Sequence, residues 1–130
     1  MKKIIVFALL ALLWASQVHA ENWELLARKW DGVSVAAGAD EFASPIQISD
    51  VGTFGTHLWR FEIMCPTSTV VRIEVVYQSQ TKVLNFNAGL PISADTGYSF
   101  TRVLPAGATV DPEHVTGTQN CAWDIYFKKG

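Results

Sequence analysis

Cysteine and histidine are scarce in this sequence of 130 residues, which contains two cysteines and three histidines. A structural zinc site needs about four clustered ligands. Beyond the N-terminal segment, only His57 and His114 are available to join Cys65 and Cys121. We therefore expect no metal centre.

Charge of one sign is not concentrated anywhere in the chain. Ten Lys and Arg residues stand against twelve Asp and Glu residues, which gives a formal net charge of −2 at pH 7. Proteins that bind DNA or RNA carry basic patches that neutralise phosphates. The sequence has no basic run of this kind, so we expect no nucleic-acid partner.

Catalytic signatures are missing as well. The chain has no G-x-S-x-G nucleophile elbow, no H-E-x-x-H pair and no glycine-rich phosphate loop. We therefore expect no catalytic residues and no cofactor. A small hydrolase that combines His57 or His114 with a carboxylate is the least favoured of our functional hypotheses.

Long hydrophobic runs are limited to the N-terminus, where two lysines precede an apolar stretch of about 12 residues. This stretch is too short to span a membrane as a helix. The small residues Val18 and Ala20 suit the pockets of a signal peptidase. We predict a signal peptide over residues 1–20 and a single domain over residues 21–130.

Removal of this signal peptide changes the charge of the chain. The signal carries two of the ten basic residues and no acidic residue, so the remaining 110 residues have a net charge of −4. No second long apolar stretch follows. We expect a protein exported to the periplasm or the extracellular space, with no membrane insertion after signal cleavage.

Strict alternation of apolar and polar residues dominates the middle and the end of the sequence. The clearest cases are residues 59–65, 70–77 and 121–127, and such a period of two is typical of antiparallel strands with one wet face. Weaker candidates lie at residues 33–37, 45–49, 82–86 and 98–104. About seven to eight short strands separated by Gly- and Pro-rich turns predict an all-β antiparallel sandwich, of immunoglobulin-like or jelly-roll order.

The segment NWELLARKWDG at residues 22–32 fits two structures. A short helix would place Trp23, Leu26, Ala27 and Trp30 on one stripe, and composition slightly favours it. An edge strand would instead point Trp23, Leu25 and Ala27 inward. We expect the helix at the start of the sandwich and keep the strand as the alternative.

Both cysteines are in phase with the inward residues of their own strands, Cys65 at the end of one and Cys121 at the start of another. In an oxidising compartment two such thiols form a disulfide. Closing a loop of about 57 residues stabilises a fold by roughly 4 kcal/mol in the chain-entropy model. We therefore predict a structural bridge between Cys65 and Cys121.

The densest polar cluster is DPEHV at residues 111–115. Asp111, Glu113 and His114 have the side chains of a metal or acid–base site. Because Asp-Pro is common in turns, we interpret the cluster as a loop that displays Glu113 and His114 to solvent.

Function is predicted less sharply than fold. Trp23, Trp30 and the outward Tyr126 are the aromatic residues free to form a contact surface, and apolar Met64, Val76 and Val103 also fall at outward positions. The leading hypothesis is a non-catalytic subunit of an envelope or extracellular structure that binds a protein partner or self-associates. A carbohydrate-binding module is the alternative, because sugars stack on exposed Trp and Tyr rings.

Overall fold

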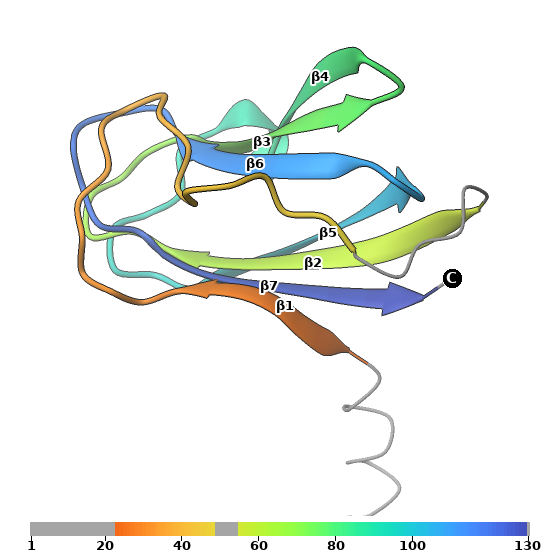
Figure 1. Cartoon of the computed structure of the whole chain (residues 1–130). Helices are drawn as coiled ribbons and strands as arrows, with labels where there is room; N and C mark the ends of the chain where they lie inside the picture. The colour runs from red at the N-terminus through yellow and green to blue at the C-terminus, as the bar shows by residue number, and fades with distance from the viewer. Residues whose placement is uncertain (1–22, 49–54, 130) are drawn as a thin grey trace, which may run out of the picture.

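The computed structural model describes residues 23–48 and 55–129 (Figure 1). The predicted signal peptide lies outside these residues. Within them, seven strands form two antiparallel sheets that lie one above the other. The lower sheet has the order β1 (Glu24–Lys29), β7 (Ala122–Lys129), β2 (Thr56–Met64) and β5 (Tyr98–Pro105). The upper sheet has the order β4 (Gln80–Asn85), β3 (Val71–Tyr77) and β6 (Thr109–His114).

This architecture confirms the predicted all-β sandwich. Among the described residues, the helical content is one 3₁₀ turn at Asn87–Gly89. The same residues contain no helix long and apolar enough to cross a membrane.

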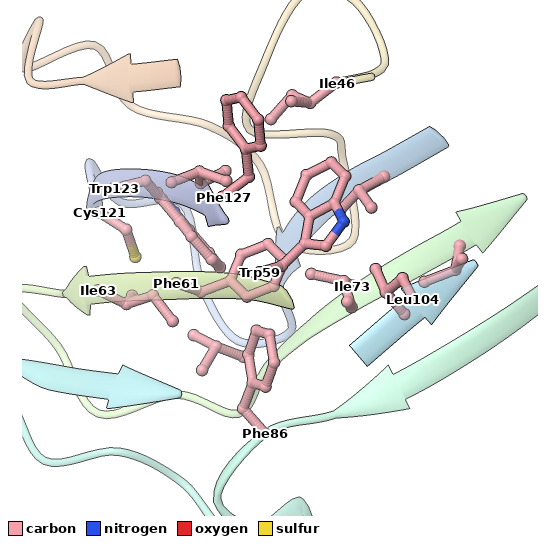
Figure 2. Close-up of a cluster of buried hydrophobic side chains, with 14 of the residues drawn as sticks. Ile46, Trp59, Phe61, Ile63, Ile73, Phe86, Leu104, Cys121, Trp123 and Phe127 are labelled. Atoms are coloured by element: carbon pink, nitrogen blue, oxygen red, sulfur yellow. The ribbon is translucent and has the colours of Figure 1, made fainter. Parts of the chain in front are cut away.

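The alternation of apolar and polar side chains along the strands explains why the two sheets pack against each other. Trp59, Phe61 and Ile63 of β2 are buried, whereas the residues between them are partly exposed. Inner rings of the two layers contact each other, with centroids 5.1 Å apart in the tilted pair of Phe61 and Phe86 (Figure 2). Phe86 also stacks on Phe100, with centroids 4.9 Å apart. Each fully buried ring of this size contributes about 1.5–3 kcal/mol of transfer free energy, so this aromatic stack is central to the sandwich.

The predicted N-terminal helix is wrong, because Glu24–Lys29 is an edge strand. The strand alternative placed Trp23, Leu25 and Ala27 inward, but of these only Ala27 packs against the core, and Leu25 is 47% exposed. β1 pairs with β7, and its register shifts between Leu25 and Ala27 because of a β-bulge. The extra residue lets Leu26 and Ala27 both pack toward the core. The bulge therefore puts two successive residues on the core side, whereas Trp30, which the helix would have placed on the same stripe, is 64% exposed.

A long connection that we call the strap, residues 31–48, joins β1 to the next described strand and runs beside β6 (Figure 1). Strands were expected at residues 33–37 and 45–49, but the strap makes only single bridges, such as Val35 with Gln119 and Ile46 with Val110. Ile46 and Ile48 are nevertheless buried. The two strands expected in the strap are therefore reduced to isolated bridges among the described residues.

The interpretation of DPEHV as a turn that displays Glu113 and His114 to solvent is also wrong, because residues 111–114 belong to β6 and both side chains are buried. Pro112 lies opposite Ile73 of β3, and its carbonyl accepts a hydrogen bond of 2.9 Å from the amide of Glu41 in the strap. The main-chain polar atoms of Pro112 therefore face the strap. Its missing N–H consequently costs β3 no hydrogen bond, which is how a proline is tolerated in an outer strand.

The predicted bridge between Cys65 and Cys121 is confirmed. Met64 pairs with Ala122 in the β2–β7 register, so the two cysteines stand opposite each other just beyond the paired strands. Both are buried. The bridge therefore locks together two neighbouring strands that are 56 residues apart in sequence.

Candidate functional site

The four-stranded sheet has one side on the core and one side exposed to solvent, which we call the outer face. Its outward side chains come from all four strands and from Trp30, which follows β1. They are Leu25, Arg28, Trp30, Leu58, Arg60, Glu62, Met64, Ser99, Thr101, Val103, Asp124 and Tyr126.

One end of the outer face is organised around Trp30, whose exposed fraction is 64%. The guanidinium carbon of Arg28 lies 4.3 Å from the centroid of its ring. Arg28 is itself fixed by Asp124, with Nε–Oδ1 and Nη2–Oδ2 distances of 2.7 and 3.4 Å. This hydrogen bonding raises the pKa of Arg28. The indole is thus exposed but held on one side by an anchored cation.

The middle of the outer face is organised around Arg60. Its guanidinium carbon lies 5.1 Å from the ring centroid of Trp23 and 4.8 Å from that of Tyr126. Its Nη2 atom donates a hydrogen bond of 2.7 Å to Oε1 of Glu62. The three aromatic residues predicted as an interaction surface therefore all border this face, and two of them contact the same arginine.

An open groove of about 470 Å³ lies beside Trp30. Its walls come from β2, β5 and β7 and from the residues next to them. Side chains that line it include Trp30, Glu62, Met64, Ser99 and Asp124. The groove volume falls within the range of about 300–1,000 Å³ that is usual for small-molecule sites.

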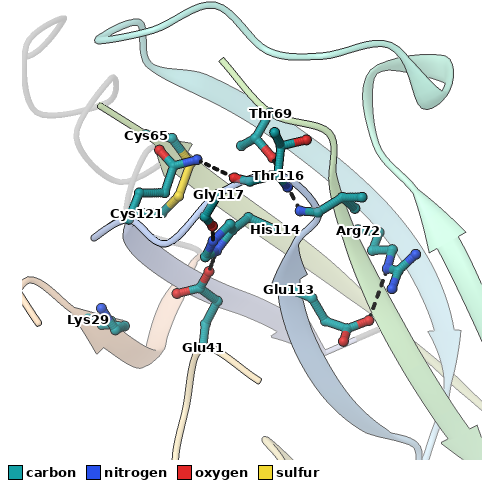
Figure 3. A network of polar contacts seen from close by, with 12 residues as sticks. Lys29, Glu41, Cys65, Thr69, Arg72, Glu113, His114, Thr116, Gly117 and Cys121 are labelled. Atoms are coloured by element: carbon teal, nitrogen blue, oxygen red, sulfur yellow. Dashed lines mark hydrogen bonds and ion pairs between the residues drawn. A yellow bond between two sulfur atoms is a disulfide. The ribbon is translucent and has the colours of Figure 1, made fainter. Parts of the chain in front are cut away.

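A second polar cluster lies inside the sandwich, next to the disulfide (Figure 3). The side chains of Glu41 and His114 are fully buried and contact each other through Oε1 and Nδ1. The other ring nitrogen of His114, Nε2, lies 2.7 Å from the carbonyl oxygen of Gly117. Burial raises the pKa of Glu41, while His114 and the charge of Lys29 oppose that rise.

The geometry of this pair fixes where its protons are. A carbonyl oxygen only accepts, so Nε2 of His114 must carry the hydrogen that it shares with Gly117. The contact between Nδ1 and Glu41 then requires one further proton, and the raised pKa of Glu41 favours its place on the carboxyl. This proton therefore lies between two fully buried side chains.

The donor atoms of Glu41, His114 and Cys121 lie within 4.8 Å of one another. Cys121 is bonded to Cys65, so its sulfur is not a thiolate. The other members of DPEHV point elsewhere: Glu113 pairs with Arg72 at 3.0 Å, and burial, followed by nearby carboxylates, raises the pKa of Asp111. The three residues considered as a site in the sequence thus do not converge.

Sequence reasoning missed the arginines of the outer face and the partner of His114. Arg28 lies two residues before Trp30 in the sequence, and Arg60 lies opposite Tyr126 on the neighbouring strand. The first spacing is local, so a search of the sequence for cation–π pairs would detect it. The contact between Glu41 and His114 spans 73 residues, and no local pattern announces it.

No protein-family model and no curated protein matches this sequence. A solved structure, the globular domain of zebrafish complement 1qA protein, is similar to the chain with a TM-score of 0.55 and 11% sequence identity. The similarity covers 79% of this chain and 93% of that domain. At this identity the likeness shows the fold alone, a jelly-roll-like β-sandwich.

Proposed function

We propose that this protein is an exported, non-catalytic binding module that contacts a protein partner, in the simplest case a second copy of itself, through the outer face. The observation that carries the proposal is the gathering of exposed apolar side chains. Leu25, Trp30, Met64 and Val103 are 47–64% exposed and all lie on this face. Exposed apolar side chains gathered on one face support a contact site there.

Two further observations support parts of the proposal. A buried disulfide is typical of proteins that fold in an oxidising compartment outside the cytoplasm. The carboxylates of the groove, Glu62 and Asp124, are each paired with an arginine, and His114 is sealed in the core. These pairings support a binding role for the groove carboxylates.

Self-association is tested by analytical ultracentrifugation across a range of concentrations. We expect concentration-dependent assembly that Leu25→Ser and Val103→Ser weaken. The matched control is Val83→Ser on β4, because Val83 is as exposed as Leu25, at 47%, but lies on the other sheet. A strictly monomeric protein would contradict self-association, and equal effects of all three substitutions would contradict the assignment of the contact to the outer face.

Carbohydrate binding is the second candidate function. One observation favours it: the groove of the outer face is lined by an exposed indole ring together with carboxylate and hydroxyl groups.

A further inference from the structure

We propose that the groove beside Trp30 binds one or two units of an electrically neutral saccharide. This inference goes beyond the proposed protein contact. It depends on the Trp30 end of the outer face, whereas Leu25 and Val103 lie away from the groove lining. The two activities can therefore be separated by substitution.

The first argument is the aromatic platform. Sugar rings present C–H groups on one side, and these pack on the face of an indole. Arg28 covers part of the Trp30 ring at 4.3 Å but does not line the groove. Trp30 itself lines the groove and is 64% exposed, so part of its side chain is open to a ligand. Because Arg28 is anchored on Asp124, the platform is held in place before a ligand arrives, which lowers the ordering cost of binding.

The second argument is the polar side of the groove. Glu62 and Ser99 are opposite each other in the β2–β5 register and both line the groove. Glu62 is 37% exposed at its side chain, and only its Oε1 atom is engaged by Arg60. A carboxylate oxygen and a hydroxyl on adjacent strands match the donors and acceptors of neighbouring sugar hydroxyl groups.

The third argument is electrical balance, which selects among ligands. Two arginines and two carboxylates form the ion pairs Arg28–Asp124 and Arg60–Glu62 around the groove. Each carboxylate of the lining is thus neutralised by an arginine that lies outside it, so the four groups together carry no net charge to attract a polyanion or a cation. A neutral ligand that combines an apolar face with hydroxyl groups is the chemistry that complements this lining.

The test uses isothermal titration calorimetry on the exported protein with cellotetraose, maltotetraose, mannotetraose and N-acetylchitotetraose. Heparin and oligogalacturonate oligosaccharides are the charged comparison. We expect saturable binding of at least one neutral tetrasaccharide and none of the charged ones. Trp30→Ala should weaken that binding at least about tenfold, and Trp30→Phe should retain most of it.

Leu90→Ala is the matched control, because Leu90 is 63% exposed, close to the 64% of Trp30, and lies outside the groove. It should leave the affinity unchanged. The inference is overturned by no saturable binding across the neutral panel, by binding of the charged sugars alone, or by equal affinity of Trp30→Ala and the parent. Trp30→Ala should fold, because the side chain is 64% exposed, and urea denaturation of the variant checks this.

Failure of this inference differs from failure of the proposed function. Val103→Ser should reduce assembly in the ultracentrifuge and leave saccharide affinity intact. If the protein assembles but binds no saccharide, only the saccharide inference is contradicted. If it binds saccharide but remains monomeric, only self-association through the outer face is contradicted.

Discussion

At the scale of single residues, the most unusual feature is an acid and an imidazole buried together. Ionised groups are costly to bury unless they are paired and hydrogen-bonded. Glu41 and His114 meet this condition through one proton between them and a second bond to Gly117. Oε2 of Glu41 and Nε1 of Trp123 lie buried without a partner among the described residues, so the cluster is not fully satisfied.

The raised pKa of Glu41 makes stability depend on pH. The folded state keeps a proton on this carboxyl that the unfolded chain loses above its ordinary pKa of 4.5. The stabilising contribution is therefore present below pH 4.5 and is lost as pH rises through the raised pKa. Glu41→Gln removes the titrating group and keeps the shape. We expect the stability of the variant relative to the parent to increase with pH, by up to about 1.4 kcal/mol per pH unit.

Urea denaturation at a series of pH values between 4 and 8 measures this difference. Glu62→Gln is the control, because Glu62 lies on the exposed side of the same fold. If the difference in unfolding free energy between Glu41→Gln and the parent stays constant with pH, Glu41 does not hold an extra proton in the folded state.

At the scale of elements, the sandwich depends on pairing between distant strands. β2 is the central example, because it pairs with both β5 and β7. Its partner β7 lies more than fifty residues away in sequence. Bringing such strands together costs loop-closure entropy, and the disulfide removes part of that cost from the folding equilibrium.

Removal of the bridge should therefore destabilise the protein strongly. We expect the double variant Cys65→Ala, Cys121→Ala to lose about 2–5 kcal/mol of unfolding free energy. Urea denaturation under non-reducing conditions measures the loss. A midpoint equal to that of the parent would show that the bridge is not structural, and non-reducing peptide mapping of protein from its native compartment should recover the linked pair.

β1 shows how one bulge changes the meaning of a sequence pattern. Residues Leu26 and Ala27 both face the core, while Leu25 and Arg28 face outward. The bulge is therefore what places Arg28 beside Asp124 and, with it, positions Trp30. The β-bulge of β1 thus helps to form the Trp30 end of the outer face, which we assign to ligand binding.

At the scale of the whole molecule, the prediction that concerns location is cleavage after Ala20. The N-terminal pattern of two lysines, a short apolar core and small residues at its end is that of a signal peptide. Intact mass of the exported protein should correspond to residues 21–130. A mass that includes the first twenty residues would contradict the prediction, and a cytoplasmic extract supplies the uncleaved precursor as a reference.

The sequence by itself determined the class of the fold and the disulfide. Alternation in residues 59–65, 70–77 and 121–127 reflects a local property, because successive side chains of a strand point to opposite faces. The inward phase of Cys65 and Cys121 follows from the same rule. These features need no knowledge of which strands pair.

Only the tertiary structure decided the rest. The bulge of β1 depends on its pairing with β7, the place of Pro112 in β6 depends on the strap beside it, and the partner of His114 comes from a segment far away in sequence. The groove likewise unites Trp30 with side chains of three other strands. Contacts of this kind depend on which surfaces come together on folding. The sequence pattern shows the local periodicity of each strand but not which distant segments it will contact.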